Sequence, residues 1–126
     1  MTMTREGGEA FAAQWADAWN RRDIEAVLEH FSNDVAFTSP TALTITGKPT
    51  IHGKTALRAY WTAALARISS LRFTVDRVLW DPVSRELAIL YTSDINGTVK
   101  KVSENLAFND EGLVASAEVL HGVGGK

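Results

Sequence analysis

The dipeptide Asn96-Gly97 constrains the fold of this 126-residue chain more than any other sequence feature. Asn-Gly is the strongest short signal for a two-residue hairpin turn, because both residues tolerate the positive φ angles that the turn requires. The segments on either side, 86–95 and 99–108, alternate apolar and polar side chains in the manner of half-buried strands. We therefore predict an antiparallel hairpin in which the turn fixes the register of the two strands.

Two further strands extend this hairpin into a predicted meander. Residues 71–80 alternate in the same way and end at the turn signal Asp81-Pro82. Residues 113–121 form the last predicted strand and follow a turn at 109–112. The second half of the chain is therefore expected to be an antiparallel sheet.

The first half of the chain has the apolar spacing of helices instead. Phe11, Trp15 and Trp19 recur every four residues and define one apolar stripe. Similar spacing predicts three helices in all, at about residues 9–20, 24–31 and 54–68. A short strand is predicted at 35–39, and the threonine-rich stretch 41–50 is expected to be a loop or a short hairpin. Helices followed by a sheet are typical of the α+β class.

Composition favours one globular domain that spans residues 1–126. Hydrophobic content is 45% and charged content 22%, which is ordinary for a soluble protein of this length. The polar start, 1–8, and the glycine-rich end, 122–126, are expected to be flexible. No apolar run approaches the roughly 20 residues that span a bilayer. We therefore expect a cytoplasmic protein.

Charge and residue types disfavour several classes of partner. The formal net charge is -2 and no basic block is present, so neither nucleic acid nor a membrane surface is an expected partner. The chain has no cysteine, and its three histidines, His30, His52 and His121, lack the spacing of metal ligands. We therefore expect no metal site and no cofactor.

Glu104 is an acid on an otherwise apolar strand face. Alternate side chains of a strand point the same way, so it shares a face with Val102, Leu106 and Phe108. Burial of an unpaired carboxylate is costly, and an acid in this position either gains a partner or binds a proton. Such acids gather at functional sites, although paired structural acids are also common.

The predicted register surrounds Glu104 with groups that suit a small-molecule pocket. Ile89 faces Glu104, and Tyr91 is its diagonal neighbour. If 109–112 is a four-residue loop, Ala117 faces Glu104 from the last strand. The same strand adds to this face Val119 and His121. A carboxyl, a phenol and an imidazole among aliphatic side chains are typical of a ligand pocket.

Four segments carry a resemblance to a known family: 19–34, Ser39-Pro40, 51–61 and 108–112. They resemble the nuclear transport factor 2-like superfamily, specifically its steroid delta-isomerase and SnoaL-like polyketide cyclase branch. The resemblance spans about residues 9–121 and implies an α+β fold described as a cone-shaped α+β barrel. In such a fold three N-terminal helices pack on a curved, mixed, mostly antiparallel sheet around a deep apolar pocket.

The resemblance also implies a homodimer that forms through the outer face of the sheet. Outward-facing Leu90 and Leu120 would suit such an interface, with Trp80 if it lies on that face.

Ketosteroid isomerases of this superfamily use an aspartate base together with a tyrosine and a protonated acid. The resemblance places the base position at Ser39, the tyrosine position at Trp15 and the protonated acid at Glu104. Serine is not a base at neutral pH without an activator, and an indole does not titrate. We therefore do not expect an ordinary ketosteroid isomerase. The resemblance places His121 near Ser39, where an imidazole would replace the missing base.

These residues leave two main functions open. The first is a cofactor-independent proton-transfer enzyme, of the isomerase, cyclase or dehydratase kind, that acts on a small hydrophobic carbonyl compound through Glu104, His121 and Tyr91. The predicted substrate-binding residues are Trp15, Trp19, Phe37, Ser39, Tyr60, Ile89, Val102, Leu106, Ala117 and Val119. The alternative is a non-catalytic binder of an apolar small molecule, and a structural association module is a third possibility. A pocket lined by Glu104 and His121, with no cation on Glu104, would favour the first two.

Overall fold

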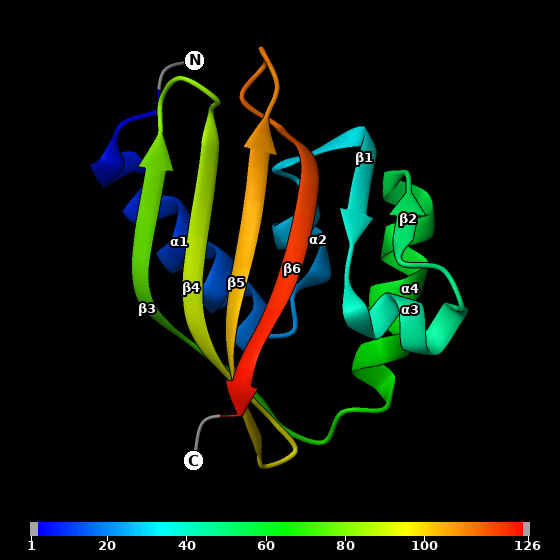
Figure 1. Ribbon diagram of the computed structural model, residues 1–126. Coiled ribbons are helices and arrows are strands. Elements are labelled where there is room, and N and C mark those ends of the chain that lie inside the picture. The colour runs from blue at the N-terminus through cyan, green and yellow to red at the C-terminus, as the bar shows by residue number, and fades with distance from the viewer. Residues whose placement is uncertain (1–2, 125–126) are drawn as a thin grey trace.

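The structure is a computed structural model that describes residues 3–124, and it contains a six-stranded sheet and four helices (Figure 1). The elements in chain order are α1 (Arg5–Asn20), α2 (Ile24–Leu28), β1 (Phe31–Thr38), α3 (Pro40–Thr46), β2 (Thr50–His52), α4 (Lys54–Ala66), β3 (Leu71–Asp81), β4 (Glu86–Ile95), β5 (Thr98–Phe108) and β6 (Val114–Gly124). The strand order is β2-β1-β6-β5-β4-β3, with β1 and β6 parallel and the other neighbours antiparallel. The predicted α+β class and mixed sheet are confirmed, and the sheet is not closed into a barrel.

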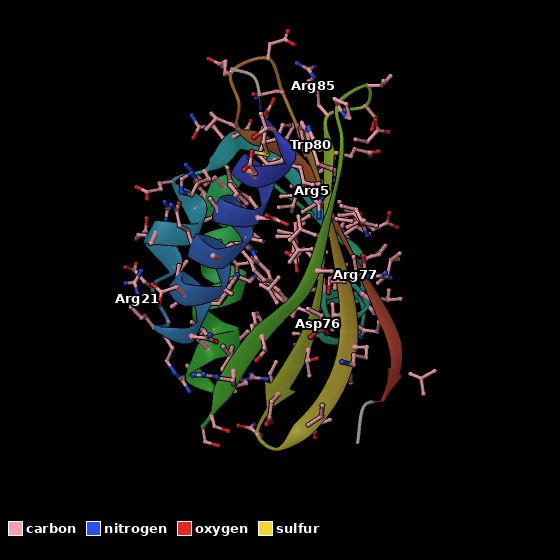
Figure 2. The ribbon with its side chains drawn as sticks, turned by 90° about the vertical axis from the view of Figure 1, so that its left-hand side faces the viewer. Arg5, Arg21, Asp76, Arg77, Trp80 and Arg85 are labelled. Atoms are coloured by element: carbon pink, nitrogen blue, oxygen red, sulfur yellow. The ribbon has the colours of Figure 1, made fainter. Side chains whose placement is uncertain are left out.

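The helices α1, α2 and α4 lie on one side of the sheet, as the view onto the edge strand β3 shows (Figure 2). Aromatic side chains fill the space between these two layers. The indole of Trp61 on α4 meets the rings of Trp19, Phe31 and Phe37 edge to face, with centroids 4.8, 5.7 and 5.4 Å away. Such contacts join α1, β1 and α4 around one residue.

The turn at Asn96-Gly97 forms as the sequence predicts. Asn96 has φ +53° and Gly97 has φ +84°, and a two-residue turn with both angles positive matches the right-handed twist of its strands. Across β4 and β5, Ile89 faces Glu104 and Tyr91 faces Val102. The register predicted from the turn is confirmed.

The predicted register of the last two strands is wrong by two residues. Val119 faces Glu104, and Ala117 faces Leu106 instead. The register shifts between Ala107 and Phe108, next to the turn, so counting from an assumed four-residue loop fails. Both residues keep the predicted face, because a shift of two preserves the alternation of side chains.

Most of the stretch 41–50, predicted to be a loop or a short hairpin, is not one: residues 41–46 belong to the helix α3 (Pro40–Thr46). Ser39 caps its N-terminus, because the Ser39 hydroxyl accepts a hydrogen bond from the Thr41 N–H at 3.1 Å. Pro40 occupies the first turn, where its missing N–H costs nothing. Gly47 ends the helix with φ +82°, a conformation that glycine adopts without strain. The short strand β2 then pairs with β1.

The helix boundaries also differ from those expected. Thr4 caps α1 and the helix begins at Arg5, so 5–8, expected to be flexible, is helical. Phe31 belongs to β1 and not to the second helix. At the other end β6 continues to Gly124, while residues 125–126 of the expected flexible end lie outside the described part of the chain.

The outer face of the sheet carries two exposed leucines, Leu79 and Leu120, which are 56% and 51% exposed. Trp80 lies on the opposite, inner face, because it pairs with the fully buried Leu87. A homodimer through the outer face stays a prediction, and Trp80 would not contribute to it. Within residues 3–124, no helix combines the length and the apolar character needed to cross a membrane.

Asn20, at the end of α1, attaches the helix layer to the edge of the sheet. Its side-chain amide donates to the Phe73 carbonyl at 3.0 Å and accepts from the Phe73 N–H at 2.8 Å. We expect Asn20→Ala to lower the free energy of unfolding by about 1–3 kcal/mol, because both half-buried backbone groups lose a partner. Urea denaturation measures this change. The exposed Asn33, changed to alanine, is the control, and an equal loss in both variants would contradict this role for Asn20.

Candidate functional site

A pocket of about 510 Å³ lies among α1, α3, α4 and the inner face of the sheet. It extends toward the end of the molecule where the β4–β5 turn, the end of β6 and the end of α4 come together, at the bottom of Figure 1. Nine residues predicted from the sequence line it: Trp19, Phe37, Ser39, Tyr60, Tyr91, Val102, Glu104, Val119 and His121. All three predicted catalytic side chains are thus in one cavity.

Four predicted substrate-binding residues are not part of this lining. Trp15, Ile89, Leu106 and Ala117 are each at most 4% exposed and lie within the hydrophobic core. The register of β5 and β6 explains Ala117, which faces Leu106 and not the acid. Trp15, Ile89 and Leu106 lie between the helices and the sheet, as the pocket residues do, but they do not form part of the pocket wall.

Several pocket residues were not predicted as site residues: Thr41, Ile45, Trp61, Ala64, Leu65, Arg67, Ile68, Leu71, Phe73, Ser93, Ile95, Asn96, Thr98 and Lys100. The α4 members belong to an apolar helix stripe that is visible in the sequence and that also suits a filled core. Phe73 and Ser93 pair across β3 and β4, so alternation from Tyr91 identifies their face. The α3 members had no signal while that segment was expected to be a loop.

Glu104 is buried and has no cationic partner among the described residues. The carboxyl is 4% exposed and accepts one hydrogen bond, from the Tyr91 hydroxyl to Oε1 at 3.1 Å. Burial raises the pKa of Glu104 to about 7, and the Tyr91 hydrogen bond opposes that rise. A carboxyl of this kind is close to half protonated at neutral pH.

Tyr91 is held in place by aromatic neighbours. Its ring centroid is 4.9 Å from that of Trp15 and 4.8 Å from that of Phe73. Burial and the nearby Glu104 carboxylate raise the pKa of Tyr91 well above its ordinary value, so the phenol keeps its proton and donates a hydrogen bond to the acid. The Trp15 indole N–H is buried without an acceptor among the described residues, so Trp15 acts on the site by packing against Tyr91.

His121 lies at the exposed end of the pocket. It faces Val102 across β5 and β6, which makes it a diagonal neighbour of Glu104 on the inner face. Partial burial, and the positive charge of Lys100, lower the pKa of His121, so the imidazole is mainly neutral at neutral pH. A neutral imidazole accepts a proton.

Ser39 lines the same pocket and is 5% exposed. Its hydroxyl oxygen accepts the Thr41 N–H as the cap of α3, which gives this serine a structural role. Within residues 3–124, no three histidine, aspartate or glutamate side chains gather as metal ligands would. Among the predicted site residues, the side chains that bring a titratable group to this pocket are therefore Glu104, Tyr60, Tyr91 and His121.

The sequence matches the model of the SnoaL-like domain family over residues 12–115. The chain belongs to the SnoaL-like domain family. No curated protein matches it. A SnoaL-like protein of unknown function from Burkholderia thailandensis is similar to it, with 27% identity, a TM-score of 0.87, and coverage of 97% of this chain and 99% of that one.

Two other solved structures share the fold of this SnoaL-like domain. A candidate ketosteroid isomerase from Kribbella flavida has 20% identity and a TM-score of 0.72, with 97% of this chain and 82% of that one covered. A candidate hydroxylase from Streptomyces galilaeus has 17% identity and a TM-score of 0.71, with 94% and 91% covered. The predicted relationship to the nuclear transport factor 2-like superfamily is confirmed, and these two likenesses establish the fold only.

The raised pKa of Glu104 predicts how the stability of this SnoaL-like domain depends on pH. The folded state holds the proton more tightly than the unfolded chain, whose glutamate titrates near 4.5, so wild type loses stability as pH rises from about 4.5 through about 7. We therefore expect the difference in free energy of unfolding between Glu104→Gln and wild type to increase, in favour of the variant, by on the order of 3 kcal/mol as pH rises through this range. Denaturant unfolding across this pH range measures the difference.

The matched control for this comparison is Glu118→Gln, which changes an exposed acid on the neighbouring strand β6. Its stability should follow that of wild type at every pH. A constant difference between Glu104→Gln and wild type would contradict a buried carboxyl with a raised pKa.

Proposed function

We propose that this SnoaL-like domain is a cofactor-independent proton-transfer enzyme that acts on a small hydrophobic carbonyl compound. The observation that supports this most is the state of Glu104, a buried carboxyl in the wall of a pocket that His121 also lines. Within residues 3–124 it has one hydrogen bond and no cationic partner. A structural acid would be paired. An acid kept neutral by burial donates a hydrogen bond to a carbonyl oxygen instead.

The hydrogen bond from Tyr91 determines which oxygen of Glu104 carries the proton. Oε1 accepts from the phenol, so it is the carbonyl oxygen of the neutral acid. The proton is then on Oε2, which remains free to donate to a ligand. Tyr91 is thus a positioning residue for the acid.

The reaction supported by these groups is an isomerisation through an enolate. A nitrogen of His121 takes a proton from the carbon next to the substrate carbonyl, and the electron pair of that C–H bond forms a C=C bond while the carbonyl π pair moves to oxygen. The Glu104 O–H stabilises the negative oxygen by a hydrogen bond. His121 then returns the proton to another carbon of the same conjugated system, so no electron or proton is gained or lost overall.

The two environments push the two groups toward these roles. Burial raises the pKa of Glu104 and lowers the pKa of His121, so a carboxyl that is about half protonated and a mainly neutral imidazole share one cavity near pH 7. In many active sites, pKa values shifted in opposite directions determine which group acts as the acid and which as the base. The pocket wall is otherwise rich in aromatic and aliphatic side chains, which suits an apolar substrate.

We expect the domain to accelerate exchange of the α-protons of 2-tetralone in D2O, followed by ¹H NMR. His121→Ala should slow this exchange about 100-fold or more, because it removes the base. His52→Ala is the control, since that histidine is exposed on β2 and outside the pocket. Equal rates for His121→Ala and wild type would exclude His121 as the base. Binding of 2-tetralone without exchange above buffer would favour the non-catalytic binder.

The rate of exchange is expected to depend on pH in a bell shape. The rate should rise as His121 loses its proton, which happens below pH 6.5 because the pKa of His121 is lowered from that ordinary value. It should fall as Glu104 ionises near pH 7. Glu104→Gln should remove the fall on the alkaline side, because an amide donates a hydrogen bond and does not titrate. An alkaline fall that persists in this variant would show that another group is responsible.

A further inference from the structure

The two adjacent lysines of β5 face opposite sides of the sheet and have different partners. Lys101 lies on the outer face, where its ammonium is 3.3 Å from Asp76 and 2.8 Å from the Thr92 hydroxyl. Lys100 lies on the inner face and lines the pocket. It makes no ion pair with any residue from 3 to 124.

Ser93 lies directly opposite Lys100, across β4 and β5. It is 7% exposed and lines the pocket, and its hydroxyl makes no hydrogen bond to another described residue. Directly opposed side chains have Cβ atoms about 5 Å apart, so a hydroxyl and an ammonium in this arrangement reach the same acceptor. The Ser93 hydroxyl is therefore open to the pocket and available to an acceptor on a ligand.

The charged side chains at this end of the pocket are mainly positive. Its lining includes the cationic Lys100 and Arg67, together with His121, whose pKa is lowered in part by the charge of Lys100. Among the described residues the one acid of the lining is Glu104, whose negative charge is reduced because burial raises its pKa to about 7. The whole chain has a formal net charge of -2, so this excess of cations is a property of the pocket and not of the protein.

We infer that Ser93 and Lys100, assisted by Arg67, form a carboxylate-binding site at the outer end of the pocket, and that the ligand is a keto acid with an apolar body. The ketone half of this inference rests on the proposed function, with the carbonyl at Glu104. Glu104 is four positions along β5 from Lys100, which is about 13 Å of strand. The lysine side chain covers part of that distance, and several methylene groups of the ligand cover the rest.

A matched pair of ligands tests this site: 6-oxo-6-phenylhexanoate, a phenyl ketone with a terminal carboxylate, and its methyl ester. Isothermal titration calorimetry gives the affinity of each at pH 6.5. We expect the acid to bind wild type about five-fold more tightly than the ester, as for a solvent-exposed ion pair. Lys100→Gln should remove most of this preference, and Ser93→Ala part of it, with no change in the affinity of the ester.

Lys101→Gln is the control, because it makes the same change of net charge one residue away on the outer face. Its preference for the acid should equal that of wild type. Equal affinities of wild type for acid and ester would overturn the carboxylate site. So would an equal loss of preference in Lys100→Gln and Lys101→Gln, since it would indicate only the overall charge.

The α-proton exchange of the same two ligands separates this inference from the proposed function. Selective binding of the acid without exchange would leave the carboxylate site standing and reject the enzyme. Exchange of both ligands without a preference for the acid would support the enzyme and reject the site.

Discussion

The turn at Asn96-Gly97 determines which side chains of β4 and β5 face the helices, and the site depends on that choice. A slip of one residue would turn every side chain of one strand to the opposite face. Glu104 would then lie on the outer face, and Tyr91 would have no acid to which to donate. Both turn residues have positive φ, which an asparagine and a glycine adopt at little cost, so the register is specified locally.

This register buries the Glu104 carboxyl, and the burial of an ionised carboxyl lowers the stability of the fold. Glu104 has one hydrogen bond, from Tyr91, and no counter-ion among the described residues, so it binds a proton more readily than an exposed acid does. The aromatic contacts of Trp15 and Phe73 hold Tyr91 where it supports the acid. A buried acid with a raised pKa reduces stability at neutral pH, and such acids gather at functional sites more than in plain cores.

Structural features that depend on a few neighbouring residues were predicted correctly from the sequence. Features that depend on an irregularity or on packing between distant residues were not. The β4–β5 register was correct because a two-residue turn leaves no freedom. The β5–β6 register was wrong because of an irregularity beside Phe108, which alternation alone does not reveal. The helix α3 was missed although Ser39-Pro40 and Gly47 supply its start and stop signals, because seven residues are too few for a clear apolar period.

A pocket was predicted both from the polar groups on the Glu104 face and from the family resemblance, and the residues of its wall were predicted unevenly for a physical reason. Side chains such as Trp15 and Leu106 share a face with the pocket residues, and only tertiary packing separates a filled part of that face from an empty one. For this pocket wall, charged side chains are more informative than apolar ones. Alternation assigns Lys100 and Lys101 to opposite faces, and within residues 3–124 only Lys101 has an acid within 4 Å. Lys100 is an exposed cation in the pocket wall, opposite Ser93, and this arrangement is the basis of the carboxylate site that we infer.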